Sequence, residues 1–190
     1  LLDVLDKYNV KATFFVTNTH PDYQNMIAEE AKRGHTVAIH SASHKYNQIY
    51  TSEQAFFDDL EQMNSIIKAQ TGNNASIIRF PGGSSNTVSK DYCPGIMTQL
   101  VNDVTARGLL YCDWNVSSGD ANSKPISTEQ VVQNVISGVQ SHNVSVVLQH
   151  DIKDFSVNAV EQIIQWGQAN GYTFLPLTTS SPMSHHRVNN

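Results

Sequence analysis

The sequence has no long apolar run and no excess of positive charge. No stretch approaches the roughly 20 apolar residues that cross a bilayer, and the opening LLDVLDKYNV is typical of part of a helix, not of a signal peptide. The formal net charge is −5, with Lys and Arg scattered along the chain. We therefore expect no nucleic-acid partner, and membrane contact only through an anchor upstream of these residues.

Charged residues and cysteines are also scarce. Charged side chains make up 15% of the 190 residues, whereas Asn, Ser, Thr and Gln are plentiful, which is compatible with an extracellular surface. The two cysteines, Cys93 and Cys112, form no CxxC pair, which disfavours a zinc site built from them. In an exported protein they would form one disulfide worth about 3 kcal/mol, and two buried free thiols are the equal alternative. The length predicts a single domain over 1–190, and we expect a monomer.

Short apolar segments of strand character alternate with segments of helical periodicity. Helices are expected at 21–33, 52–71, 95–107, 128–140 and 156–169, and strands at 11–16, 36–39, 76–78, 108–112, 144–148 and 172–175. This alternation predicts an α/β fold with parallel strands and outer helices. The segment after Pro182, with His185 and His186, is expected to be a loosely held terminus.

Two histidines follow one of the expected strands. In VAIHSASHKY, His40 and His44 are four residues apart, so on one turn of helix or a tight loop they face the same side. Neutral imidazole is a common ligand for zinc and similar ions, and two such nitrogens make half of a tetrahedral site. The alternative is that each histidine is an ordinary surface or hydrogen-bonded residue.

Other polar residues also occupy strand ends. Arg79 follows 76–78, Asp113 and Trp114 follow 108–112, and His150 follows 144–148 after one residue. Because the carboxyl ends of parallel strands converge in a barrel, this pattern favours a catalytic site. Each residue has another interpretation: Arg79 as a surface charge, Asp113 as a turn cap, Trp114 as a core residue and His150 as part of a loop.

Four segments together resemble a known family. They are H-S-x-x-H (His40, Ser41, His44), R-x-P-G-G (Arg79, Pro81, Gly82), D-W (Asp113, Trp114) and L-x-H (Leu148, His150). In order and spacing they resemble motifs two to five of the polysaccharide deacetylases, the carbohydrate esterases of family four that share the NodB homology domain. The resemblance covers essentially the whole chain and is specific as a set, although L-x-H alone carries no weight.

The resemblance implies a distorted (β/α) barrel of parallel strands and a hydrolase at the cell surface or in the cell wall. The substrate would be an N-acetylated glycan polymer, such as the N-acetylglucosamine of peptidoglycan or a chitin-like polymer. Two alternatives stay open: an esterase of the same fold that removes O-acetyl groups from xylan, and a non-catalytic glycan-binding relative.

The resemblance also implies roles for these residues. His40 and His44 would supply two ligands of a divalent metal, zinc before Co, Ni or Mn, and Ser41 would support their loop. His150 would protonate the leaving amine, with Asp113 paired to it.

The same resemblance implies that Arg79 orients the catalytic base. The backbone N–H of Gly82, after Pro81, would bind the oxyanion. Trp114 and Leu148 would form the wall that holds the acetyl methyl group.

The chain also departs from the family pattern. Gly82 stands where the family often has Tyr, which keeps the N–H but no side chain, and the additional Asp upstream of D-W is not found at Leu110. The first motif, T-F-D-D-G, which carries the base and the third metal ligand, and the first strand are absent from the given residues. We expect an N-terminally truncated active enzyme in preference to a defective relative. The piece alone is then expected to bind metal weakly and to be close to inactive.

Overall fold

The computed structural model describes residues 1–122, 124 and 126–190. The chain divides into two compact units. The first, called here the helical unit, comprises Leu1–Ala12 and Trp114–Leu175. The second, called the sheet unit, comprises Thr13–Asp113 and Pro176–Asn190. The assignment of 1–190 to a single domain stays a prediction.

The sheet unit contains four parallel strands in the order β1-β2-β3-β4. They are β1 (Thr13–Thr17), β2 (Thr36–Ser41), β3 (Ile77–Ile78) and β4 (Leu110–Tyr111). The helical segments between them are η1 (Pro21–Tyr23), α2 (Asn25–Lys32), α3 (Tyr46–Ile49), α4 (Glu53–Thr71), η2 (Val88–Asp91) and α5 (Ile96–Ala106). Because all four strands are parallel, their carboxyl ends lie along one edge of the sheet, where the loops after them begin.

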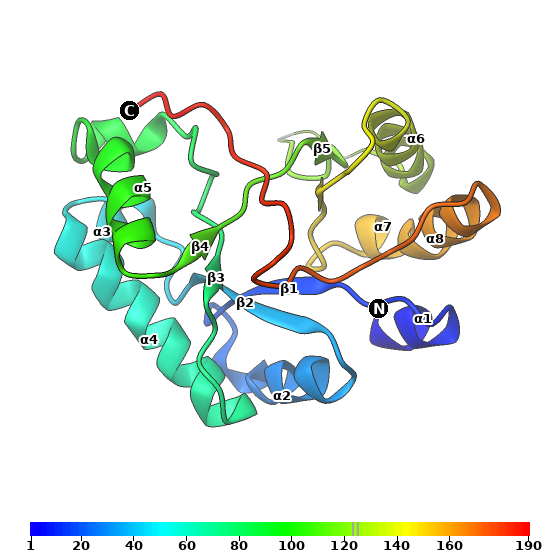
Figure 1. Ribbon diagram of the computed structural model, residues 1–190, viewed down its shortest axis with the longest axis horizontal. Helices are drawn as coiled ribbons and strands as arrows, with labels where there is room; N and C mark the ends of the chain where they lie inside the picture. The colour runs from blue at the N-terminus through cyan, green and yellow to red at the C-terminus, as the bar shows by residue number, and fades with distance from the viewer. Residues whose placement is uncertain (123, 125) are drawn as a thin grey trace. The chain divides into compact units, whose positions relative to one another are not determined.

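Helices α2 and α4 contact β2, and α5 contacts β4 (Figure 1). Helix α4 begins after Ser52, whose hydroxyl accepts a hydrogen bond from the Ala55 N–H (3.1 Å), and ends at Gly72, which adopts φ 80°. Its buried face matches the face predicted from the helical spacing. It carries Phe56, Leu60, Met63 and Ile67 into the core of this unit.

The described residues of the helical unit form two short parallel strands and four helices. They are α1 (Leu2–Lys7), β5 (Val116–Ser117), α6 (Thr128–Val139), β6 (Val147–Leu148), α7 (Asp154–Val157) and α8 (Val160–Ala169). Helix α6 packs on β5 and on α8. A glycine is needed where α6 meets β5, because a Cβ at Gly138 would lie 2.4 Å from Cγ1 of Val116.

Several boundaries differ from the predictions. The strand expected at 172–175 is wrong. Phe174 packs on α8 instead, so close to Gly167 that a Cβ there would be 2.5 Å from its ring. The helices expected at 21–33 and 156–169 are each broken into a short turn and a longer helix. Strand β5 was not predicted, because two residues are too few to show a period. Cys93 and Cys112 are both free thiols.

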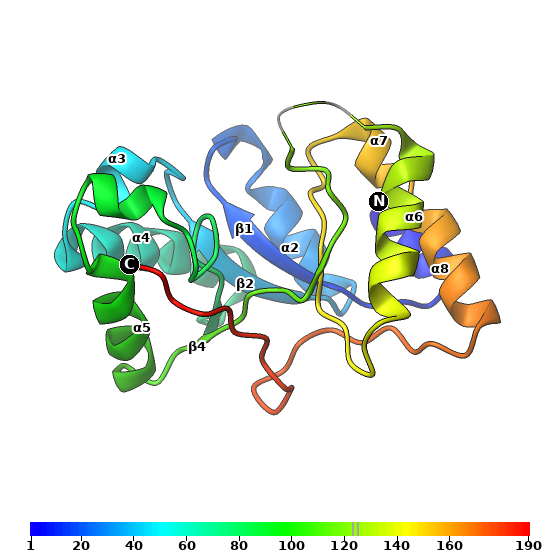
Figure 2. The same cartoon turned by 90° about the horizontal axis from the view of Figure 1, so that it is seen from above.

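The expectation of a loosely held C-terminus is also wrong. The segment runs beside β4 and α5 (Figure 2), where the Asp113 N–H donates to the Ser184 carbonyl (2.7 Å) and the Thr98 N–H donates to the Asn190 carbonyl (2.8 Å). The His185 ring stacks on Tyr111 with 4.0 Å between centroids. Backbone pairing and ring stacking therefore fix a segment that its polar sequence suggested was mobile. No helix in the described part of the chain is both long and apolar enough to cross a bilayer.

Candidate active site

His40 and His44 lie at the carboxyl end of β2, where the pairing with β1 is irregular. Val16 pairs with Ile39, but the next pair is Thr17 with Ser41, so His40 is the extra residue of a bulge. Bulges re-aim the side chain that they carry. His44 adopts φ 53°, a turn conformation, and the two imidazole centroids are 5.0 Å apart. The structure thus brings this predicted pair together.

A carbonyl group fixes the orientation of the His40 ring. Nδ1 of His40 lies 2.7 Å from the carbonyl oxygen of Arg79, the first residue after β3. A carbonyl can only accept, so Nδ1 carries the proton and Nε2 of the neutral ring carries the lone pair. This arrangement is typical of histidines that bind metals.

Asp59 of α4 supports the loop between the two histidines. Its carboxylate accepts three hydrogen bonds, from the Ser41 hydroxyl (2.6 Å), the Ala42 N–H (2.9 Å) and the Ser43 N–H (2.8 Å). Ser41 in turn accepts from the His44 N–H (2.8 Å). Asp59 was not predicted, although an acidic residue on the apolar face of a helix is itself a signal.

The histidine pair fits a divalent metal in part. His40 and His44 offer two neighbouring imidazoles, the ligand type that zinc accepts. Across the residues that the structure describes, no three His, Cys, Asp or Glu side chains are grouped so as to hold a metal ion. The described residues therefore account for two ligands of such an ion.

The Arg79 side chain is buried, so the alternative interpretation of Arg79 as a surface charge is wrong. Its Nε and Nη2 donate to the carbonyls of Cys112 and Asp113, each at 2.9 Å, and its guanidinium lies 4.0 Å from the Phe15 ring centroid. Burial lowers the pKa of Arg79, although hydrogen bonding at Cys112 and the neighbouring Asp113 carboxylate oppose this. Arg79 therefore ties the ends of β3 and β4 together, while its carbonyl orients His40.

Asp113 is fully buried and lies in a network of serine and backbone donors. Its carboxylate accepts from the Ser84 N–H (2.8 Å), the Ser84 hydroxyl (2.5 Å) and the His186 N–H (2.9 Å). These bonds fasten the loop after β3 and the C-terminal segment to the end of β4. They suit the alternative reading of Asp113 as a residue that caps a turn.

The loop after β3 begins with a tight turn at Phe80–Gly83. The Gly83 N–H donates to the Phe80 carbonyl (2.8 Å), Pro81 occupies the second position and Gly82 the third, at φ 78°. This is the type II arrangement, which favours glycine at its third position. The Pro81 carbonyl accepts from the buried Tyr50 hydroxyl (2.7 Å). Because the peptide bond is planar and trans, the Gly82 N–H points away from Tyr50.

The space beside Gly82 explains why this position has no side chain. A Cβ there would lie 2.6 Å from the Tyr46 hydroxyl oxygen. Tyr46 is half-buried, and its ring lies 5.7 Å from that of His44 and 5.5 Å from that of Tyr50. Burial raises the pKa of Tyr46.

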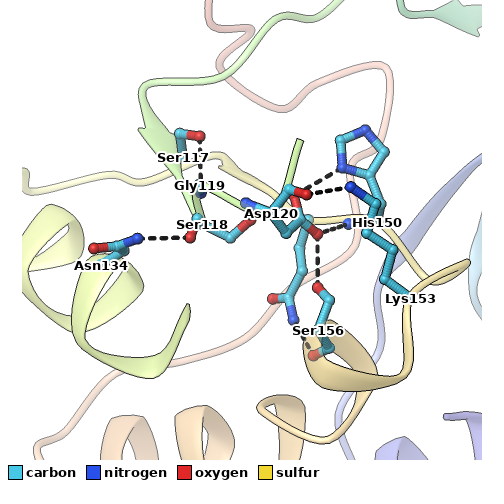
Figure 3. A network of polar contacts seen from close by, with 9 residues as sticks. Ser117, Ser118, Gly119, Asp120, Asn134, His150, Lys153 and Ser156 are labelled. Atoms are coloured by element: carbon cyan, nitrogen blue, oxygen red, sulfur yellow. Dashed lines mark hydrogen bonds and ion pairs between the residues drawn. The ribbon is translucent and has the colours of Figure 1, made fainter. Parts of the chain in front are cut away.

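His150 belongs to the helical unit, and its ring contacts the carboxylate of Asp120 (Figure 3). The carboxylate expected to pair with it, Asp113, belongs to the sheet unit. Its Nδ1 lies 2.8 Å from Asp120 Oδ1, and its N–H donates to Oδ2 of the same carboxylate (2.7 Å). The Ser156 hydroxyl also donates to Oδ2 (2.6 Å). Lys153 donates to the Asp120 carbonyl. The carboxylate fixes the ring with its proton on Nδ1, and the His150 side chain is 37% exposed.

The pKa of Asp120 reflects this network. Asp120 is 2% exposed, and burial alone would raise its pKa. Hydrogen bonds from the His150 ring, the Ser156 hydroxyl, the His150 N–H and the Ser118 hydroxyl outweigh burial and hold the pKa of Asp120 well below its ordinary value. The carboxylate is therefore charged at neutral pH.

Trp114 and Leu148, the predicted wall residues, are both half-buried in the helical unit. Leu148 pairs with Ser117 across the two-stranded sheet, and its carbonyl accepts from the Ser118 N–H (3.0 Å). This bond starts the loop that carries Asp120. The backbone of Leu148 thus positions the carboxylate that holds His150.

Comparison with known proteins gives consistent matches. The family profile described as polysaccharide deacetylase matches residues 1–93. A peptidoglycan-N-acetylglucosamine deacetylase of Bacillus cereus is 28% identical over 179 residues, which is 92% of this chain and 62% of that protein. A bifunctional xylanase/deacetylase of Pseudobutyrivibrio xylanivorans is 29% identical over 94% of this chain and 27% of its own length. The chain thus spans less than two thirds of these relatives.

One solved structure is similar over the whole chain. The crystal structure of the catalytic domain of a peptidoglycan N-acetylglucosamine deacetylase from Eubacterium rectale matches with a TM-score of 0.99 and 98% identity. The match covers 100% of this chain and 86% of that one. The predicted α/β fold with parallel strands is confirmed. The chain belongs to the polysaccharide deacetylase family.

Proposed function

We propose that this chain carries catalytic residues of a metal-dependent hydrolase that removes N-acetyl groups from the N-acetylglucosamine of peptidoglycan. The observation that carries the proposal is the 98% identity, over the whole chain, to the catalytic domain of the Eubacterium rectale peptidoglycan N-acetylglucosamine deacetylase. Peptidoglycan lies in the cell wall, so the protein acts outside the cell, at its surface.

In this proposal His40 and His44 hold a divalent ion, zinc in the first place. When bound, such an ion polarises the acetyl carbonyl and lowers the pKa of water to roughly 7. The His40–Arg79 contact supports this role, since it leaves the lone pair on Nε2. Asp59 and Ser41 hold the loop so that both rings keep their spacing.

His150 acts as the general acid that protonates the leaving amine. Asp120 positions it by fixing the ring with Nδ1 as donor, so Nε2 is the atom that exchanges the proton. The Gly82 N–H, directed outward by the Tyr50–Pro81 bond, donates to the oxyanion. Arg79 orients His40 through its carbonyl, Asp113 holds the Gly82 loop, and Trp114 and Leu148 enclose the acetyl methyl group.

The test is an assay of the full-length protein on peptidoglycan and on N-acetylglucosamine tetramer. We expect one acetate and one new free amine per event, loss of activity with a chelator, and recovery with zinc. His150→Ala should abolish turnover, while His142→Ala, an exposed histidine of the same unit, should leave it unchanged. Acetate release that survives complete metal removal would contradict the proposal.

Removal of O-acetyl groups from xylan is the second candidate. It is supported by the 29% identity to the bifunctional xylanase/deacetylase of Pseudobutyrivibrio xylanivorans. A preference for acetylated xylan over N-acetylglucosamine tetramer, measured as kcat/KM, would favour it. Glycan binding without release of acetate from either substrate would leave a non-catalytic relative.

A further inference from the structure

Tyr46 is the first residue of helix α3, which follows the loop after β2, and its hydroxyl lies against the turn that presents the Gly82 N–H. A Cβ on Gly82 would meet this hydroxyl oxygen at 2.6 Å and Cβ of Asn86 at 3.0 Å. The Tyr46 hydroxyl therefore occupies the space where a side chain at position 82 would begin. Two hydrogen-bond donors, an amide and a phenol, lie side by side at the carboxyl edge of the sheet.

Packing holds the Tyr46 ring in this place. Its neighbours are the His44 ring at 5.7 Å and the Tyr50 ring at 5.5 Å, the latter edge to face. Tyr50 is fully buried and stacks with Phe56 of the core. The ring is thus held between the core and the histidine pair, which is the preorganisation that a catalytic donor needs.

The hydroxyl has no assigned task within the sheet unit. No described residue accepts from it or donates to it, whereas the Tyr50 hydroxyl one turn later bonds to Pro81. The Gly82 residue is exposed and its N–H likewise meets no acceptor among the described residues. A phenol is protonated at neutral pH and so can donate.

We propose that Tyr46 is a catalytic residue, whose hydroxyl donates a second hydrogen bond, beside that of the Gly82 N–H, to the acetyl oxygen as it gains negative charge. This role rests on the proposed deacetylase function. The bond strengthens in the transition state, because the oxygen is more negative there than in the substrate. Removal of the hydroxyl therefore lowers kcat and leaves KM unchanged.

The test is Tyr46→Phe in the full-length, zinc-loaded protein with N-acetylglucosamine tetramer as substrate. This change keeps the ring and removes only the donor. We expect kcat to fall by roughly 10²- to 10³-fold, with KM and zinc content within about twofold of wild type. Tyr92→Phe, an exposed tyrosine of the same unit, is the matched control and should leave kcat unchanged.

A binding measurement gives a readout apart from turnover. A phosphonate analogue of the N-acetyl group presents anionic oxygens in tetrahedral geometry. Tyr46→Phe should raise its Kd by about the factor by which kcat falls, since the analogue resembles the transition state.

A double-mutant cycle with Gly82→Ala tests the contact itself. The new Cβ displaces the Tyr46 hydroxyl, and the cost of a side chain at positive φ is the same in both backgrounds. Gly82→Ala should therefore lower kcat by a larger factor in the wild type than in Tyr46→Phe. Additive effects, or a Tyr46→Phe kcat within twofold of wild type, would overturn the role and leave the deacetylase function standing. A wild type that releases no acetate from any substrate would overturn both.

Discussion

The two histidine sites of this chain are supported by different kinds of partner. His150 is held by the Asp120 carboxylate, a buried charge that accepts from the ring, the backbone and Ser156. His40 is held by the neutral Arg79 carbonyl, and the charged group near it, Asp59, contacts the loop backbone and Ser41. A charge beside the ring suits a histidine that exchanges protons, whereas a neutral partner fixes the tautomer of a ligand without adding charge.

The largest expected loss of kcat comes from removing the Asp120 charge that lies beside the His150 ring. Asp120→Asn keeps the size of the side chain but loses the carboxylate that fixes the ring. We expect kcat of the full-length protein to fall by about 10²- to 10⁴-fold, and excess zinc to have no effect. Asp151→Asn, exposed and next to His150, is the control. Recovery of kcat in Asp120→Asn on addition of zinc would contradict the assignment of His150 to proton exchange and not to metal binding.

Asp59→Asn, in contrast, should cause a loss of activity that added zinc restores. The amide nitrogen replaces one oxygen that accepts from the Ser41–Ser43 loop, so a donor then faces a donor. We expect zinc affinity to fall by roughly 10- to 100-fold, and activity to return when zinc is added. Titration of apoenzyme activity with zinc measures this. Asp58→Asn, the exposed neighbour, should behave like wild type, and a zinc-independent loss in Asp59→Asn would contradict the comparison.

The stability of the fold should depend on pH through Asp120. The pKa of Asp120 is lowered by folding, so this carboxylate stabilises the fold above its unfolded pKa of about 3.9. The contribution should be complete above about pH 5 and should decline as the pH falls toward the folded pKa. The difference in unfolding free energy between wild type and Asp120→Asn, measured in urea, should shrink below about pH 4. A constant difference between pH 3 and pH 6 would disprove it.

The smallest expected effect lies in the C-terminal segment. His185→Ala removes the ring that stacks on Tyr111 at 4.0 Å. We expect a loss of about 1 kcal/mol in the unfolding free energy, with zinc affinity unchanged. Arg187→Ala, exposed in the same segment, is the control. A larger loss in the control would show that the stack contributes little.

The sequence predicts features whose residues are close together in the chain. The α4 face, its Ser52 start and its Gly72 end follow from periodicity and capping. The placement of His40 and Arg79 follows from strands that end in polar residues. Asp120 was missed because β5, the strand before it, has only two residues and shows no period in the sequence. The partner predicted for His150 was instead Asp113, which follows the predicted strand 108–112. Tyr46 was missed because its contact with Gly82 joins the start of α3 to the turn after β3, two places far apart in the sequence.

The turn at Phe80–Gly83 is connected to the hydrophobic core through Tyr50. The Tyr50 hydroxyl bonds to the Pro81 carbonyl and so fixes the direction of the Gly82 N–H at the surface. The Tyr50 ring stacks on Phe56 in the core. Under the proposed function, we expect mutants of Phe56 to fold and to bind zinc, yet to turn over slowly. Such mutants would resemble variants of a catalytic residue in their kinetics, although the substituted residue lies in the core. The packing of the interior thus extends through Tyr50 to the surface amide that we propose as the oxyanion donor.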